Sequence, residues 1–260
     1  MRDGITDRNF DNLAGRFSQN IYHTTKGKIR QAVLMRDLLE LPLLSQPCQI
    51  LDVGGGQGQI ALKLAALGHQ LCLTDISSDM LQIAQQRAVE LGLTDRLQVL
   101  NSPLQQLPQV LQGKHYPLVL CHAVLEWLAN PADAIQQLRQ WVAPGGILSL
   151  MFYNKDAHRF SNILYGNFDY VKADMRAKKP VRLNPQQPLV SADVQAWCQQ
   201  AGFTLLAKTG VRCFHDYLRD RTQQQSHYQE LEALELQYNR QEPYASLGRY
   251  THFLLRLDKV

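Results

Sequence analysis

The sequence has few cysteines, and none of them stands in an arrangement typical of a metal site or a disulfide framework. Its five cysteines lie far apart in 260 residues, with no C-x-x-C pair and no metal-like grouping with the eight histidines, at positions Cys48, Cys72, Cys121, Cys198 and Cys213. Such spacing argues against zinc motifs and compact disulfide scaffolds. We expect free, mostly buried thiols in a reducing compartment.

Long hydrophobic runs are also absent. The first ten residues, MRDGITDRNF, are polar and charged, and no stretch approaches the length of a membrane span, which is about 20 apolar residues. No internal repeat or low-complexity tract is visible. From the sequence alone we expect a cytoplasmic protein without membrane contact.

Neither sign of charge dominates. The 27 Lys and Arg against 23 Asp and Glu give a formal net charge of +4, a bias that permits an anionic partner without requiring one. Hydrophobic residues make up 45% and charged residues 19%, as in ordinary globular proteins with a sizeable core. Because α/β chains of this length often form one domain, we expect a single domain over residues 1–260.

From residue 48 onward, short apolar runs alternate with runs of helical periodicity, the pattern of a parallel sheet wrapped by helices. Five β-α units are expected up to residue 153, with strands at 48–53, 70–75, 96–100, 117–122 and 146–153. Helices are expected at 59–68, 77–92 and 131–146, the first and last closed by glycines. Two further strands, 203–210 and 250–257, would complete a seven-stranded sheet with helices on both faces.

The remaining segments divide the chain around this core. A helix at 26–41 precedes the first strand, and another at about 220–240 precedes the last. Residues 154–189 have little periodicity, several aromatics and clustered charge, so we interpret them as an insert or lid beside the strand ends. The expected organisation is therefore an N-terminal helical cover (1–47), a core (48–153), a lid (154–190) and a C-terminal part (191–260).

The first strand ends in the glycine-rich turn DVGGGQG, where Asp52, Gly54, Gly56 and Gly58 follow the pattern D-x-G-x-G-x-G. Glycines allow close approach of a ligand, and the helix that follows offers unpaired N–H groups. Such turns occur in dinucleotide dehydrogenases and in methyltransferases that use S-adenosylmethionine, and some are merely tight turns. Asp75, at the end of the next strand, suits a ribose in both enzyme classes, while Ser77 suits the cap of the helix after it.

The sequence CHAVLEWLANPADAIQQLRQWVAPGGILSL, together with DISSDML, favours the methyltransferases. Over residues 48–153 the chain resembles the Rossmann-like class I methyltransferases, which use S-adenosyl-L-methionine as methyl donor. The resemblance implies that Gly54 and Gly55 approach the methionine moiety and that Asp75 holds the ribose. In many relatives an acidic residue follows the third strand, but here Asn101, Leu104 and Gln105 do, so backbone groups or the Gln105 amide would contact the adenine.

Two further residues have roles that the resemblance suggests. His122 would face the sulfonium region, although a structural histidine is an equal alternative. Arg30, on the same helix face as Lys26, could pair with the cofactor carboxylate, and a solvated charge is the alternative.

Outside the cofactor motifs, several stretches resemble bacterial tRNA methyltransferases that act on a wobble-uridine carboxylate. They are RNFDNLAGRFSQNIYHTTKGKIRQAVL, HAVLEWL, LSLMFYN, GNFDYV, TGVRCFHDYLR and RQEPYASLGRY. This resemblance implies methylation of 5-carboxymethoxyuridine at position 34 of tRNA to the methyl ester, with the anticodon loop as partner. A basic, aromatic lid fits an RNA loop: residues 155–182 carry seven Lys or Arg and three Asp, interleaved with Phe160, Tyr165, Phe168 and Tyr170.

A carboxylate acceptor also agrees with the lack of an evident general base. Carboxylic acids with a pKa near 4 are ionised at neutral pH, so the acceptor needs orientation and partial desolvation but no deprotonation. We therefore assign no proton-transferring residue and no metal. Candidates for orienting the substrate carboxylate or flanking phosphates are Tyr22, Lys26, Arg212, His215 and Arg249.

Three other functions remain open from the sequence. The first is a small-molecule O-methyltransferase of the quinone-biosynthesis type on the same core. The second is a non-catalytic RNA-binding protein that keeps the fold, and a dehydrogenase is a distant third. Methyl transfer to tRNA, tested with and without ribonuclease, separates the first two from the tRNA enzyme.

Overall fold

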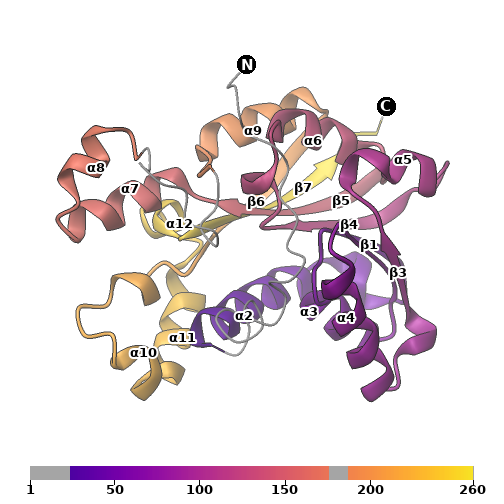
Figure 1. Ribbon diagram of the computed structural model, residues 1–260, viewed down its shortest axis with the longest axis horizontal. Helices are drawn as coiled ribbons and strands as arrows, with labels where there is room; N and C mark the ends of the chain where they lie inside the picture. Colours follow the sequence, from indigo (N-terminus) through magenta and orange to yellow (C-terminus); the bar gives the residue numbers. More distant parts are fainter. Residues whose placement is uncertain (1–23, 176–186, 260) are drawn as a thin grey trace.

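The computed structural model describes residues 24–175 and 187–259, which build a seven-stranded sheet of order β3-β2-β1-β4-β5-β7-β6 (Figure 1). The strands are β1 (Gln49–Val53), β2 (Gln70–Asp75), β3 (Leu97–Asn101), β4 (Tyr116–His122), β5 (Val142–Tyr153), β6 (Phe203–Val211) and β7 (Tyr250–Leu257). The first five strands pair in parallel, and β7 lies antiparallel between β5 and β6. The predicted seven-stranded, mostly parallel sheet is confirmed.

Helices cover both faces of the sheet (Figure 1). One face carries α2 (Thr25–Leu39), α3 (Gln59–Ala66), α4 (Ser78–Glu90) and α11 (Tyr228–Tyr238). The other carries α5 (Leu107–Val110), α6 (Pro131–Arg139) and α9 (Ser191–Gln200). Each layer of helices buries its own apolar cluster against the sheet, which explains why the central strands are apolar on both sides.

Local sequence signals set several helix starts. The Ser77 hydroxyl accepts a hydrogen bond from the Met80 N–H and caps α4, as predicted. Thr24 caps α2 in the same way, through the Gly27 N–H. At the start of α3, Gly58 adopts a left-handed conformation (φ +70°), which links the glycine turn to the helix.

The predicted helix at 131–146 is too long. The helix α6 ends at Arg139, and β5 already begins at Val142. Pro144 has no N–H, and Gly145 has φ +76°, so neither residue can continue a helix. Gly145 therefore turns the chain inside the strand and does not close the helix.

The predicted helix at 220–240 is two helices, α10 (Gln223–Ser226) and α11. The Ser226 hydroxyl bonds to the Thr222 carbonyl and the His227 ring, and such local bonds compete with helix continuation. The insert is more regular than predicted, because α7 (Lys155–Leu164) and α8 (Phe168–Lys172) fill its first half. A short helix, α12 (Tyr244–Leu247), precedes β7.

The strand order reverses between β1 and β4, whose carboxyl ends lie side by side. In open α/β sheets, ligands bind outside the carboxyl ends of the strands at such a switch point. None of the helices within the two described ranges is long and apolar enough to cross a membrane.

Candidate active site

The glycine turn after β1 leaves no room for side chains. A Cβ on Gly54, which has φ +67°, would lie 2.5 Å from Cγ2 of Val124. One on Gly55 would lie 2.2 Å from Cδ1 of Leu73. The turn therefore packs tightly against these two side chains, and any residue larger than glycine at either position would have to displace them.

Asp75 fastens this turn from the end of β2. One carboxylate oxygen accepts the Gly56 N–H at 2.9 Å, and the other accepts the Ser77 N–H at 2.8 Å. Two backbone bonds fix the plane of a carboxylate while leaving lone pairs for further donors. Asp75 is thus positioned as a ribose acceptor should be, although that role stays a prediction.

A cavity opens at the switch point, and four of the predicted cofactor residues line it: Arg30, Gly54, Gly55 and His122. Its other lining residues were not predicted and are Gln31, Leu34, Asp52, Gln59, Ile60 and Met151. Asp52 is the first residue of the glycine pattern, and Gln31 follows Arg30 on α2, so both positions had signals that could have found them.

Asp52 is a buried carboxyl at the bottom of this cavity. Burial, together with the nearby Asp75 charge, raises the pKa of Asp52 to about 7. A protonated carboxyl can donate a hydrogen bond, whereas a carboxylate only accepts. The protonated form avoids a second negative charge beside Asp75.

Arg30 and His122 stand on α2 and at the end of β4, respectively. The guanidinium of Arg30 lies 4.7 Å from the ring centre of Tyr250, and within the described residues its buried Nε has no hydrogen-bond partner. The Nε2 atom of His122 is 2.8 Å from the Ser149 hydroxyl. Burial, followed by the charge of Arg30, lowers the pKa of His122 well below its usual range, so this ring is neutral at pH 7.

The predicted adenine segment lies outside the lining of this cavity. Leu104 is buried and Gln105 exposed in a short 3₁₀ turn after β3. Asn101 donates to the carbonyls of Asp75 and Ile76 at 3.1 and 3.0 Å. Asn101 therefore ties the end of β3 to the end of β2, and the contacts of Leu104 and Gln105 with adenine stay a prediction.

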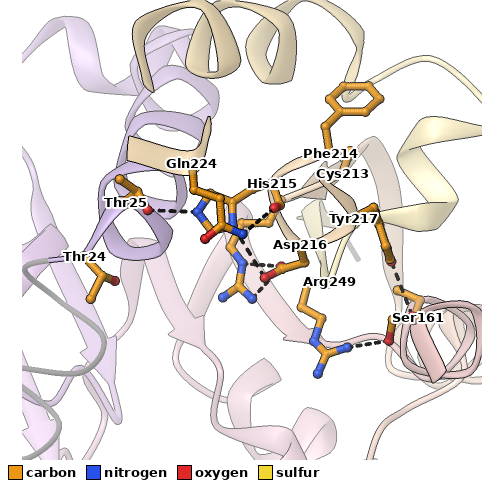
Figure 2. A network of polar contacts seen from close by, with 12 residues as sticks. Thr24, Thr25, Ser161, Cys213, Phe214, His215, Asp216, Tyr217, Gln224 and Arg249 are labelled. Atoms are coloured by element: carbon orange, nitrogen blue, oxygen red, sulfur yellow. Dashed lines mark hydrogen bonds and ion pairs between the residues drawn. The ribbon is translucent and has the colours of Figure 1, made fainter. Parts of the chain in front are cut away.

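A group of cationic side chains, Lys26, Arg212 and Arg249, lies around Asp216. Figure 2 shows Asp216 and Arg249 in this region. Arg212 is buried and clamps the Asp216 carboxylate, with Nε at 2.7 Å and Nη2 at 2.6 Å from Oδ2. It also lies 5.8 Å from the Tyr250 ring, so Tyr250 borders both Arg30 and Arg212. The cavity and the cationic group thus share one aromatic side chain.

Lys26 and Arg249 complete this group. Partial burial of its ammonium, and the charges of Arg212, Arg221 and Arg249, lower the pKa of Lys26, while Asp216 opposes them. Arg249 donates from Nη1 to the Ser161 hydroxyl at 2.9 Å and stacks 4.9 Å from the Tyr153 ring (Figure 2). Positive charge exceeds what Asp216 can neutralise, so this surface favours an anion.

Of the other predicted orienting residues, Tyr22 lies outside the described residues. His215 is buried, and its Nε2 is 2.9 Å from the Thr25 hydroxyl (Figure 2). This bond joins the loop after β6 to the start of α2. His215 therefore fixes the residue that precedes Lys26, and direct contact of His215 with a substrate stays a prediction.

Glu235 on α11 anchors the same loop, a role that the sequence did not suggest. Its buried carboxylate accepts the backbone N–H groups of Cys213, Phe214 and His215 at 2.7, 2.9 and 2.9 Å. Burial raises the pKa of Glu235, and these three bonds oppose the shift. Arg212, just before them, holds a left-handed conformation with φ +64°.

We expect Glu235→Gln to destabilise the protein by about 1–3 kcal/mol, because an amide NH₂ would face the Cys213 N–H in place of an acceptor. For a chain of this size, that corresponds to a fall in Tm of roughly 2–12 °C. Thermal unfolding measures the shift. Glu230→Gln, an exposed position on the same helix, is the matched control, and equal Tm values for both variants would contradict the anchoring role.

The lid differs from its predicted electrostatic character in the part that the structure describes. Lys155 and Arg159 pair with Asp174 and Asp156, and Lys172 is balanced by Asp169 in number. The excess of positive charge therefore belongs to four residues outside the described ranges, Arg176, Lys178, Lys179 and Arg182.

The lid aromatics divide into exposed and packed rings. Phe160, Tyr165 and Phe168 are 37%, 49% and 57% exposed. Tyr170 packs edge-on against His158, at 5.9 Å between ring centres. The Tyr165 hydroxyl donates to the Asp216 carbonyl at 2.6 Å, so the lid adjoins the cationic group.

Within the described ranges, no three His, Cys, Asp or Glu side chains are grouped to hold a metal.

Comparison with known proteins agrees with this geometry. Residues 51–148 match the family model described as a methyltransferase domain. The fold is similar to that of magnesium protoporphyrin IX methyltransferase from Synechocystis PCC 6803 with bound SAH, at 16% identity and TM-score 0.65, covering 96% of each chain. A ubiquinone biosynthesis O-methyltransferase of Shewanella halifaxensis is 28% identical, over 45% of this chain and 49% of its own.

Similarity over nearly the full length is found with another protein. The tRNA 5-carboxymethoxyuridine methyltransferase of Escherichia coli (strain K12) is 46% identical, covering 97% of this chain and 97% of its own. The quinone enzyme matches less than half of this chain, whereas this relative matches nearly all of it. The chain belongs to the family of tRNA 5-carboxymethoxyuridine methyltransferases.

Proposed function

We propose that this protein transfers a methyl group from S-adenosylmethionine to the carboxylate of 5-carboxymethoxyuridine at position 34 of tRNA, forming the methyl ester. The observation that carries the proposal is the cationic group of Lys26, Arg212 and Arg249 directly beside the cavity lined by Arg30 and the glycine turn. An anionic acceptor next to a sulfonium donor needs this arrangement. A tRNA substrate also implies a cytoplasmic protein.

The cavity has the features that the cofactor requires. We assign the methionine moiety to Gly54 and Gly55, which line the cavity, and the ribose hydroxyls to the Asp75 carboxylate, which lies beyond the lining residues at the end of β2 and has a fixed plane. Arg30 has an unpartnered, buried Nε at the cavity wall, within the described residues, and suits the cofactor carboxylate. We assign His122 to the same amino-acid end, and Leu104 and Gln105 to the adenine.

The chemistry needs no proton transfer. When bound, S-adenosylmethionine supplies an electrophilic methyl carbon on a sulfonium. A carboxylate oxygen of the substrate forms the new C–O bond as the C–S bond breaks, and the two opposite charges cancel. What the protein contributes is alignment of oxygen, carbon and sulfur, and exclusion of water from the approach.

The candidate orienting residues differ in how many of their hydrogen-bond donors are used within the protein. Arg212 spends two guanidinium nitrogens on Asp216, so we infer that it shapes the site through that pair. Arg249 uses one nitrogen on Ser161, and no described residue accepts a hydrogen bond from the Lys26 ammonium. We therefore assign the substrate carboxylate, or the phosphate beside it, to Lys26 and Arg249.

We place the anticodon loop over the lid. Phe160, Tyr165 and Phe168 offer exposed rings, and a splayed base stacked on an aromatic ring gains about 1–3 kcal/mol. The Arg221 guanidinium lies 5.3 Å from the Tyr165 ring, which adds positive charge between lid and site. In this proposal residues 48–153 and Arg30 bind the cofactor, and the flanking parts 154–190 and 191–260, with the rest of 1–47, face the RNA.

Phe168→Ala is expected to raise KM for tRNA by roughly 5- to 150-fold, because one stacking interaction is lost. The affinity for S-adenosylhomocysteine should not change, since Phe168 is remote from the cavity lining. Steady-state kinetics with tRNA and calorimetry with S-adenosylhomocysteine test both statements. Leu91→Ala, an equally exposed apolar position at the end of α4, is the control, and an unchanged KM for Phe168→Ala would remove this ring from the interface.

Nucleoside mass spectrometry of tRNA bearing 5-carboxymethoxyuridine, treated with protein and S-adenosylmethionine, tests the function itself. The expected product is heavier by one CH₂, and mild alkali should release the methyl group as methanol. If a labelled methyl group of S-adenosylmethionine were transferred only to a lipid-soluble small molecule, the result would instead support a quinone O-methyltransferase. Cofactor binding without any turnover on this tRNA would support an RNA-binding protein.

A further inference from the structure

A line of polar side chains crosses the sheet beneath the cofactor cavity. It starts at His122 on β4, whose Nε2 is 2.8 Å from the Ser149 hydroxyl on β5. The same hydroxyl is 2.8 Å from Nε2 of His252 on β7, and Nδ1 of His252 is 2.8 Å from a carboxylate oxygen of Asp37 on α2. The line therefore runs from the cavity wall to the helix that carries Arg30.

This line is buried in an apolar part of the core. Ser149, His252 and Asp37 are at most 1% exposed, and the cluster around them consists of aliphatic residues from α2, α3 and the central strands. Buried polar groups stabilise a fold only when they are all paired, and apolar residues of similar volume often serve as well. Stability alone therefore does not explain why polar side chains occupy these buried positions.

The protonation state of Asp37, at the α2 end of the line, determines which nitrogen of His252 carries a hydrogen. Asp37 is also bound by Arg36 and Arg240, each with a nitrogen 2.7 Å from Oδ1. Burial opposes ionisation of Asp37, but the hydrogen bond from His252 and the charge of Arg36 outweigh it and lower its pKa, so Asp37 is a carboxylate. A carboxylate only accepts, and therefore Nδ1 of His252 carries a hydrogen.

Since Arg36 and Arg240 already pair with Asp37, a protonated His252 would bury a third cation beside them, and the neutral ring determines the remaining hydrogens. Nε2 of His252 accepts from the Ser149 hydroxyl, and the Ser149 oxygen accepts from Nε2–H of His122. We propose that Ser149, His252 and Asp37 are positioning residues that hold the His122 hydrogen on Nε2, so that His122 presents an unprotonated Nδ1 to the cofactor cavity.

An unprotonated Nδ1 selects a donor from the ligand. The amino-acid end of the cofactor carries a carboxylate and an ammonium; with Arg30 assigned to the carboxylate, His122 accepts a hydrogen bond from the ammonium. This step rests on the proposed placement of the cofactor, whereas the tautomer of His122 is a property of the free protein. With a hydrogen on Nδ1, His122 could not accept this hydrogen bond, because Nδ1–H and the ammonium are both donors.

Two-bond ¹⁵N–¹H correlation spectra of the free protein at neutral pH identify the histidine tautomers, with His122→Gln and His252→Gln assigning the signals. We expect the Nε2–H form for His122. In Ser149→Ala, we expect the Nδ1–H form to appear and the Kd for S-adenosylhomocysteine to rise by about tenfold, the effect of one hydrogen bond to a charged group. Ser149→Thr keeps the hydroxyl and should restore both properties.

Thr251→Val is the matched control, because it removes a buried sheet hydroxyl that has no hydrogen-bond partner among the described residues. It should change neither the tautomer nor the Kd. An Nδ1–H signal for His122 in the unaltered protein would overturn the proposal, even if the variants fail to fold. An unchanged Kd in Ser149→Ala would overturn it as well. No tRNA enters these measurements, so their failure is distinct from failure of the proposed function.

Discussion

Asp75→Ala is expected to weaken binding of S-adenosylhomocysteine by about 100-fold or more. Two hydrogen bonds from ribose hydroxyls to a carboxylate contribute about 1.5–3 kcal/mol each, and a factor of ten in Kd corresponds to about 1.4 kcal/mol. The substitution also releases the Gly56 and Ser77 N–H groups that the carboxylate accepts. The glycine turn then loses the contact that fixes it toward the ligand.

Isothermal titration calorimetry measures this effect without any RNA substrate. The exposed carboxylate of Asp95, in the turn before β3, provides the control, and Asp95→Ala should bind as the unaltered protein does. If Asp75→Ala were to bind within threefold of the unaltered protein, the ribose would have to lie elsewhere. The cavity assignment would then be wrong.

Arg249→Ala is expected to lower kcat/KM for tRNA by about 10- to 150-fold. One charge-assisted hydrogen bond to the acceptor carboxylate or phosphate contributes about 1.5–3 kcal/mol, and each 1.36 kcal/mol is a factor of ten in rate. Arg249 is already fastened by Ser161 and by the Tyr153 ring. Such a preorganised cation loses little freedom when it binds an anion.

The affinity for S-adenosylhomocysteine should be unchanged in Arg249→Ala, since this residue is not part of the cavity lining. Arg256→Ala, an exposed arginine near the other end of β7, controls for loss of one positive charge. A similar fall in kcat/KM for both variants would indicate general attraction of RNA and would contradict the assignment of Arg249 to the acceptor.

The sheet and the cofactor end of the site could be predicted because their signals are local. The strands were recognised as short apolar runs, and DVGGGQG and Asp75 are each adjacent to a strand end. The helix ends were less accurate: Pro144 and Gly145 were assigned to α6 although their backbone belongs to β5. Which of two neighbouring elements such residues join depends on strand pairing, here between Tyr116 and Val142.

The polar interior could not be predicted, because its partners are distant in the sequence. Glu235 accepts N–H groups more than 19 residues away, and the Asp37–His252 pair is separated by 215 positions. Neither residue belongs to a recognisable motif, and an isolated buried Glu or His has the same sequence appearance as an exposed one. The charge of the lid was misjudged for a different reason, because the sum over 155–182 hid a local balance. In the described part of the lid, acidic and basic side chains pair with one another.

In the proposed function, the helix α2 fixes the distance between the contacts to the cofactor and those to the acceptor. Lys26, Arg30, Leu34 and Asp37 stand on one side of it at intervals of three or four residues, and an α-helix rises 1.5 Å per residue. Lys26 and Arg30 are therefore about 6 Å apart along the axis, a spacing that no loop motion can alter. The proposed contacts to the methyl donor and to the methyl acceptor therefore lie on one rigid helix. Inserting one residue between Lys26 and Arg30 would rotate one of these two side chains about 100° away from its proposed ligand.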